Sequence, residues 1–397
     1  MQTKAKWLAT VAATALIATG AAAQDGDTIK IGGMVSITGA GASIGRVAEI
    51  GWQMAIDDIN AAGGIAGKQV EFVLADTMTD PTHAVSEARR LVENEQIDAM
   101  VGPVTSQETI PVTAVTTAAN IPQITTAASA TLTPEAAPYH FSNSPTGLNQ
   151  MIANIEYAIN ELNLTKLAII SDNGGMSKAA VQEIEDYMAE KGIEPTAIQE
   201  FAFRTEDMTP QLFSLRSSGA EGVLIINSLG DDARKFLQNR DEIGWNVPVL
   251  GSLTTTNFAV GNAEILGVEA FNNVYSVQFE GMSYCPGDPV GESLYAKFDA
   301  KAKETVSDLS RLGGSSALSP YYVEPFVLKA AIEGSGSTDG DKVAAWIEAN
   351  AAEIENMLGT FAANDQTHFL PSSEAMVVTN KAYAPREDGL TERLQCD

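Results

Sequence analysis

The chain has 397 residues, of which 24 are Lys or Arg and 51 are Asp or Glu, and its formal net charge is −27 at pH 7. At roughly 150 residues per domain, this length predicts two or three domains that each bury a core. The acidic balance argues against nucleic acid or an anionic membrane surface as a partner, because phosphate groups attract an excess of Lys and Arg. Two cysteines and three histidines rule out a cysteine-rich zinc module and an iron–sulfur cluster, so we expect no metal and no cofactor.

Residues 1–23 have the pattern of a signal peptide. Lys4 and Lys6 precede an apolar run from Trp7 to Ile17 that is too short to span a bilayer, and Ala21–Ala23 supplies the small residues of a cleavage site. A buried N-terminal helix is the alternative reading of this segment. We expect cleavage near Ala23 and export to the periplasm as a soluble protein. No cysteine follows the apolar run, so a lipid anchor is not indicated.

Export to the periplasm would allow the two cysteines to form a disulfide bond. Cys285 and Cys396 can oxidise in that compartment, and an even count fits one disulfide. Such a bond would close a loop of about 110 residues and stabilise the fold by about 3–5 kcal/mol in the chain-entropy model. Two unpaired thiols are the alternative.

Short apolar runs alternate with segments of helical periodicity along the whole chain, as in Val85, Ala88 and Leu91 on one helix face. Strands separated by helices at this spacing indicate parallel sheets with helices on both faces. We therefore predict an α/β fold with two doubly wound parallel-sheet lobes. The expected strands cover residues 29–37, 70–75, 97–101, 121–124, 139–142, 167–170, 196–203, 222–226, 247–250 and 274–279. The expected helices cover residues 44–60, 83–95, 147–162, 176–191, 210–218, 231–243, 319–333 and 341–355.

Loops at the carboxyl ends of the strands should carry the function of such a fold. The first is the glycine-rich loop 36–45, which has three readings. Its glycines fit only a loose form of a dinucleotide fingerprint, with Asp76 as the candidate ribose ligand. The sequence Gly41-x-Ser43-x-Gly45 also matches the nucleophile elbow of a hydrolase, although it follows the first strand instead of a central one. The third reading is a ligand-binding loop beside a helix N-terminus.

Two further loops are rich in hydroxyl groups. Thr105 and Glu108 have the spacing of a capping box, so a helix is expected to begin there with free N–H groups at the sheet edge. The loop 124–131 follows the next strand. Together the two loops bring Ser106, Ala127 and Ser129 above one sheet, where hydroxyls and helix-end N–H groups would form a carboxylate cradle without arginine. Ordinary caps and turns are the alternative for each loop alone.

A series of short motifs runs along the first part of the chain. They are Thr38–Gly39, Gly45, Ala55, Asp58–Asn60, Ala62–Ile65, Gly67–Lys68, Asp76, Asp80–Pro81, Gly102–Pro103 and the Thr-Thr-Ala-Ala-Ser loop at 125–129. In order and spacing these motifs resemble those of the leucine/isoleucine/valine-binding family, the type I periplasmic binding proteins of ABC importers. The resemblance is strong over residues 28–130 and weaker after 280.

The resemblance implies two lobes joined by a three-segment hinge, with a small ligand trapped between them. The expected N-terminal lobe is 28–143 plus about 280–355, and the expected C-terminal lobe is 144–279 plus about 356–397. In this family the α-carboxylate and part of the ammonium group are held by the loops that correspond to Ser106, Ala127 and Ser129. The implied function is capture of a branched-chain-like amino acid, or a related small carboxylate or amide, by a monomer that delivers it to a membrane permease and is not an enzyme. An exported hydrolase using Ser43 is the competing class.

Departures from the family pattern concern the ligand. Ile44, Met176 and Leu229 stand where the family often has aromatic residues, and together with Phe258 they predict an apolar lining, with plain core packing as the alternative. The family's acidic partner for the ammonium group aligns near residues 253–254, where this chain has no carboxylate. Either Asp231 or its neighbour Asp232 substitutes, or the ligand has no ammonium group, because a buried cation without a partner is unfavourable by several kcal/mol.

Overall fold

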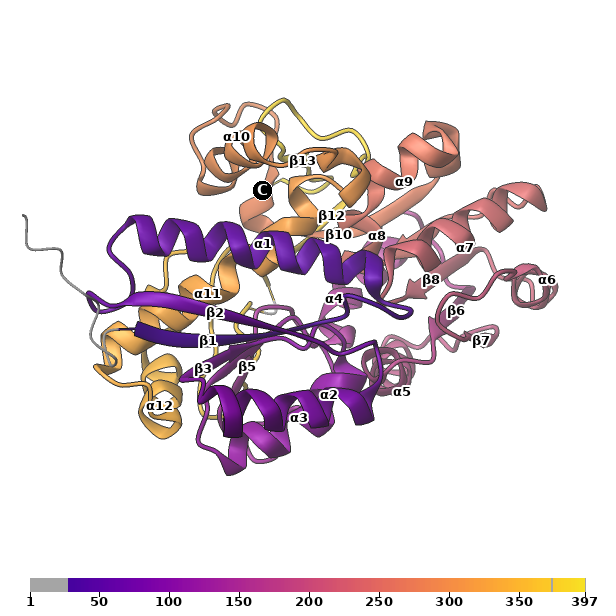
Figure 1. Cartoon of the computed structure of the whole chain (residues 1–397). Coiled ribbons are helices and arrows are strands. Elements are labelled where there is room, and N and C mark those ends of the chain that lie inside the picture. Colours follow the sequence, from indigo (N-terminus) through magenta and orange to yellow (C-terminus); the bar gives the residue numbers. More distant parts are fainter. Residues whose placement is uncertain (1–27, 373, 397) are drawn as a thin grey trace, which may run out of the picture.

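The computed structural model describes residues 28–372 and 374–396, so the expected signal peptide lies outside the described residues. Two sheets, each flanked by helices, form two α/β lobes (Figure 1). The predicted fold class is confirmed. Within the described part of the chain, no helix is long and apolar enough to cross a membrane.

The first sheet has five parallel strands in the order β2-β1-β3-β4-β5. These are β1 (Thr28–Val35), β2 (Gln69–Asp76), β3 (Ala99–Val101), β4 (Gln123–Thr125) and β5 (His140–Ser142), and the helices between them are α1 (Ala42–Ala61), α2 (Pro81–Arg90) and α3 (Ser106–Ala118). Asp80 caps α2 by accepting a hydrogen bond from the His83 N–H, and Pro81 occupies the first turn, where its missing N–H costs nothing. The expected helix 83–95 continues past α2 as a single π-helical turn over Leu91–Glu95.

The second sheet has six strands in the order β12-β10-β9-β8-β6-β7. Five are parallel, and β12 pairs antiparallel with β10 at the edge. The strands are β6 (Leu167–Asp172), β7 (Ile198–Phe201), β8 (Gly222–Ile226), β9 (Val249–Gly251), β10 (Val274–Phe279) and β12 (Met376–Thr379), with helices α4 (Gly147–Asn160), α5 (Gly175–Glu190), α6 (Thr209–Ser217) and α7 (Gly230–Glu242). Strands β6 and β8 are buried along their whole length, as central parallel strands should be.

Later helices return to the first sheet after the chain has left the second. These are α10 (Leu294–Thr305), α11 (Ser315–Ser335) and α12 (Gly340–Asn350), and α11 packs along α1. Gly51 permits this close approach, because a Cβ there would lie 2.8 Å from the Tyr321 Cβ. In the same contact the Trp52 indole N–H donates to the buried Glu324 carboxyl group at 2.5 Å. Helix α10 was not expected from the sequence, nor were the short helices α8 (Leu253–Asn257) and α9 (Ala259–Leu266).

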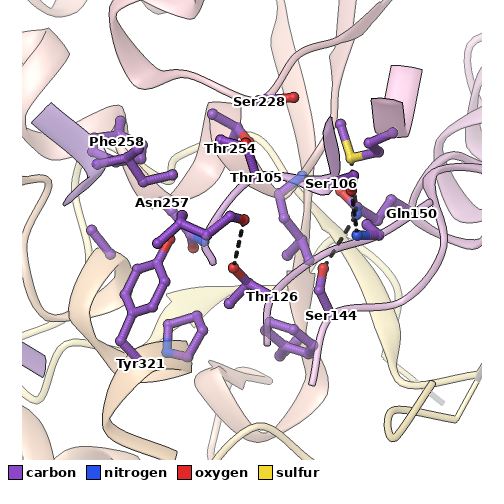
Figure 2. Close-up of a pocket in the computed structure, with 18 residues that line it drawn as sticks. Thr105, Ser106, Thr126, Ser144, Gln150, Ser228, Thr254, Asn257, Phe258 and Tyr321 are labelled. Carbon is purple, nitrogen blue, oxygen red and sulfur yellow. Dashed lines mark hydrogen bonds between the residues drawn. The ribbon is translucent and has the colours of Figure 1, made fainter. Parts of the chain in front are cut away.

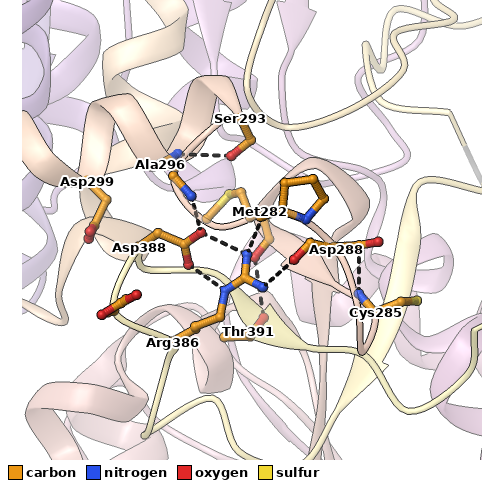
Figure 3. A network of polar contacts seen from close by, with 12 residues as sticks. Met282, Cys285, Asp288, Ser293, Ala296, Asp299, Arg386, Asp388 and Thr391 are labelled. Carbon is orange, nitrogen blue, oxygen red and sulfur yellow. Dashed lines mark hydrogen bonds and ion pairs between the residues drawn. The ribbon is translucent and has the colours of Figure 1, made fainter.

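The C-terminal tail is tied to the segment that follows β10. The Cys285–Cys396 disulfide is present, which confirms that prediction. Two short strands, β11 (Ser283–Tyr284) and β13 (Thr391–Glu392), pair in parallel. Arg386 makes two hydrogen bonds to Asp388, at 2.8 and 2.9 Å, and this guanidinium holds the pKa of the carboxyl group down at about 2 (Figure 3).

The chain passes between the two sheets at three places: after β5, after β10, and between α12 and β12. On the third passage Phe369 forms a bridge with Ser142 at the edge of the first sheet before the chain enters β12. The lobe boundaries given above stay a prediction.

Candidate functional site

A cavity of about 70 Å³ lies where the carboxyl ends of the two sheets face each other (Figure 2). Helices and loops of both sheets, together with α11, supply its wall. The lining residues are Ile44, Val104, Thr105, Ser106, Thr126, Ala128, Ser144, Gln150, Met176, Ser228, Leu253, Thr254, Asn257, Phe258, Phe279, Ala317, Pro320 and Tyr321. The space is that of a few water molecules, so it suits a small solute.

The first turn of α3 forms one side of this cavity. Strand β3 ends at Val101 and α3 begins at Ser106, so the N–H groups of Ser106 and Gln107, which have no acceptor inside the helix, lie at the sheet edge. The Ser106 hydroxyl accepts a hydrogen bond from the Ala128 N–H at 3.0 Å, which fixes the following loop against α3. The expected capping box is wrong in detail: the Thr105 hydroxyl donates to the Glu108 carboxyl group instead of accepting from a backbone N–H. Burial raises the pKa of Glu108, and the hydrogen bond from Thr105 partly offsets this increase.

The first turn of α5 forms the opposite side. Asp172, at the carboxyl end of β6, accepts hydrogen bonds from the Gly174 N–H at 2.8 Å and the Ser228 N–H at 2.5 Å. It thereby joins the loop before α5 to the loop after β8. Burial raises the pKa of this carboxyl group, although the hydrogen bonds act in the opposite direction. Met176 and Ser228 reach the cavity from these two loops.

Gln150 on α4 links two segments of the cavity wall: the chain that leaves the first sheet after β5, and the start of α8 in the second lobe. Its Nε2 donates to the Pro145 carbonyl at 3.0 Å, and its Oε1 accepts from the Leu253 N–H at 3.2 Å. Figure 2 shows Ser106 and Gln150 toward one side of the cavity and Tyr321 toward the other. A buried glutamine with both ends bonded fixes its surroundings, since each broken bond would leave an unsatisfied polar atom.

The two lobes touch each other beside the cavity. The Ser43 hydroxyl on α1 donates to Asp231 Oδ2 on α7 at 2.9 Å, and Asp231 also pairs with Arg234 at 2.7 Å. On the other side, a Cβ added to Gly175 would lie 3.0 Å from the Gln107 nitrogen of α3. The structure is therefore a closed form, with the cavity enclosed between the lobes.

Every lining side chain is neutral or apolar. Burial raises the pKa of the Tyr321 phenol, so its hydroxyl stays protonated. The helices α3 and α5, of 13 and 16 residues, both begin at the cavity. Because the N-terminus of a helix carries about half a positive charge, the cavity favours an anionic group over a cationic one.

The structure brings together some of the predicted site residues. Ser106, Ile44 and Met176 line the cavity, as does Phe258. Gln150, Asn257 and Tyr321 were missed. The sequence contained a weak indication for Gln150, because it is a polar residue on the buried face of α4. It contained no indication that Asn257 or Tyr321 would line the site.

Four other predicted residues lie outside the cavity wall. Ala127, Ser129 and Leu229 are fully buried, and their chain neighbours Thr126, Ala128 and Ser228 line the cavity instead. The correction is a shift by one residue, because successive side chains in extended loops point in opposite directions. Asp231 stands beside the cavity, bonded to Ser43 as described. The neighbouring Asp232 is buried and accepts from the Arg204 N–H.

The glycine-rich loop 36–45 is organised around its own contacts. Asp76 accepts from the N–H groups of Ile37 and Thr38, at 2.9 and 3.2 Å, and from the Thr38 hydroxyl, so its carboxylate already serves this loop and not a ribose. Ser43 bonds to Asp231, and no histidine of the described residues bonds to it. His140 bonds to Thr125 instead. This geometry does not support the interpretation of the loop as a hydrolase nucleophile elbow or as a dinucleotide-binding loop.

Comparisons with known proteins agree with this architecture. The model of a family described as periplasmic binding protein matches residues 28–383. The chain is 26% identical over 338 residues to Leu/Ile/Val-binding protein homolog 8 of Brucella abortus, covering 80% of this chain and 83% of that protein. It is also 26% identical over 322 residues to an amino acid binding protein of Pseudomonas aeruginosa, covering 80% and 81%.

Two solved structures share the fold. One is the branched-chain amino acid transporter substrate binding protein LivJ from Streptococcus pneumoniae in complex with isoleucine, with a TM-score of 0.72, 22% identity and coverage of 92% of this chain and 97% of that one. The other is an ABC transporter solute binding protein from R. palustris in complex with 4-hydroxybenzoate, with a TM-score of 0.77, 16% identity and coverage of 94% and 96%.

Proposed function

The chain belongs to the periplasmic binding protein family, and from this premise we propose that it is the solute-binding component of an ABC importer. It captures a small amino acid, or a related small carboxylate or amide, in the periplasm and delivers it to a membrane permease. The observation that carries the proposal is the enclosed cavity, whose wall is drawn from both sheets and from two helix N-termini.

Lobe closure is the step that links binding to delivery. A solute in this cavity contacts Ser106 and Thr126 on one lobe and Met176 and Ser228 on the other. Because those contacts exist together only in the closed form, binding shifts the open–closed equilibrium toward closed. The closed lobes then present one joint surface to the permease, which releases the solute when the lobes open.

A thermal-shift screen of the purified, dialysed protein tests the proposal. The panel contains amino acids, short carboxylates, aromatic acids and amides. At least one of them is expected to raise the melting temperature, by an amount that grows with the logarithm of its concentration divided by its Kd. If no compound stabilises the protein, the proposal fails.

Ser106 and Ser129 form a matched pair for the strongest ligand of that screen. Both are buried serines, Ser106 at the start of α3 and Ser129 on the loop after β4, but only Ser106 lines the cavity. A hydrogen bond to a charged group contributes about 1.5–3 kcal/mol, so Ser106→Ala is expected to weaken binding about 10- to 150-fold. Ser129→Ala should leave the affinity unchanged, since the Ser129 hydroxyl bonds to Thr131 at 3.0 Å. Equal affinities for the two variants would contradict the assigned site.

A further inference from the structure

Among the described residues, the wall of the interlobe cavity contains no carboxylate side chain that could partner a positive charge. Its polar groups are the hydroxyls and amides of Thr105, Ser106, Thr126, Ser144, Gln150, Ser228, Thr254, Asn257 and Tyr321. An ammonium group taken out of water needs a carboxylate beside it, because hydroxyls alone do not replace its hydration. The lining residues include no Asp and no Glu.

Carboxylates behind the second-lobe wall are engaged elsewhere. Asp172 accepts a backbone N–H on each of its two oxygens. Asp231 is paired with Arg234 beside the cavity. Asp232 accepts from the Arg204 N–H, and burial raises the pKa of this carboxyl group to about 7, which weakens its negative charge near neutral pH. None of the three lines the cavity.

The backbone of the same cavity favours a negative charge. Two long helices, α3 and α5, begin there, and a residue from each first turn, Ser106 and Met176, reaches the wall. The Ser106 hydroxyl accepts from the Ala128 N–H, which leaves its own hydrogen to donate to an acceptor in the cavity. A carboxylate is matched by these donors.

We infer that the solute is a monocarboxylate with an uncharged, largely apolar tail and no ammonium group. The inference rests on the proposed function, because it names a chemical class for the same cavity. Ile44, Met176 and Phe258 supply apolar surface for the tail. Asn257 and Tyr321, away from Ser106 in Figure 2, offer hydrogen bonds to a neutral polar group at its far end.

Matched pairs that differ only in a 2-amino group test the inference by calorimetric titration of the dialysed protein. The pairs are propanoate with alanine, 4-methylpentanoate with leucine, and 3-phenylpropanoate with phenylalanine. At least one acid is expected to bind about tenfold or more tightly than its amino acid. If an amino acid binds as tightly as its acid, or if only neutral amides bind, the inference is overturned and the proposed function stands. If no compound of either panel binds, both fail.

Installing the missing carboxylate provides the converse test. Thr254→Asp places a counter-charge in the wall, so the preference for an acid over its amino acid should fall about tenfold or more. Thr82→Asp makes the same change on an exposed turn of α2 and should keep the wild-type preference. Asn257→Asp, which is isosteric, serves as the second variant in case Thr254→Asp does not fold. An unchanged preference in a folded variant overturns the counter-charge argument.

Discussion

A larger side chain at Gly175 should obstruct lobe closure without harming either lobe. Gly175 begins α5, and a Cβ there would lie 3.0 Å from the Gln107 nitrogen and 3.2 Å from the Ser106 carbonyl carbon of the facing helix. The methyl groups of valine reach further than the Cβ. Overpacking of this kind costs about 1–3 kcal/mol, and the cost falls on the closed form alone. Gly175→Val is therefore expected to raise the Kd about 5- to 150-fold.

Calorimetric titration with the strongest ligand of the screen measures this change. Lys178→Val is the matched control, because it places the same side chain on the exposed face of the same helix. Both variants should melt like the wild-type protein in the absence of ligand. If Gly175→Val binds with wild-type affinity, then closure does not bring α5 against α3, and the reasoning is refuted.

Three further predictions concern stability and activity. Replacing Cys285 and Cys396 by serine should lower the free energy of unfolding by about 4–5 kcal/mol in urea titrations, because the bond closes a long loop; a change below about 1 kcal/mol would contradict the entropic argument. Burial raises the pKa of Asp232 from 3.8 to about 7, so the native state disfavours ionisation and loses stability as the pH rises from 4 to 7. Asp232→Asn should remove that loss and be up to about 4 kcal/mol more stable than wild type at pH 8, with little difference at pH 4; equal unfolding curves at pH 8 would count against it. Ser43→Ala should weaken binding about fivefold by removing the bond to Asp231, and neither wild type nor variant should hydrolyse esters or amides.

The fold follows from sequence periodicity wherever strands are buried. Segments such as Leu167–Ile170 of β6 and Gly222–Ile226 of β8 are continuous apolar runs because helices cover both faces of the sheet. Helices α8 and α9 escaped prediction because they are short, and the threonines of α8 have low helix propensity. Their position is set by tertiary packing, as when the Thr256 hydroxyl bonds to Ser276 of β10 at 2.6 Å.

The site was predictable in its loops but not in its side chains. Helix starts after β3 and β6 follow from strand–helix alternation, and Ser106 and Met176, in the first turns of the two helices, line the cavity; their contact with a solute stays a prediction. The choice between Ala127 and Ala128 depends on the direction of each side chain in an irregular loop, which no periodicity encodes. Tyr321 lies on α11, far along the chain, and reaches the cavity only because α11 packs on α1.

Small-angle X-ray scattering, with and without the strongest ligand of the screen, tests lobe closure most directly. The account predicts that the radius of gyration of the dialysed protein falls when the ligand is added at saturating concentration, and that Gly175→Val reduces this compaction. An identical scattering curve for the free and saturated protein would contradict it.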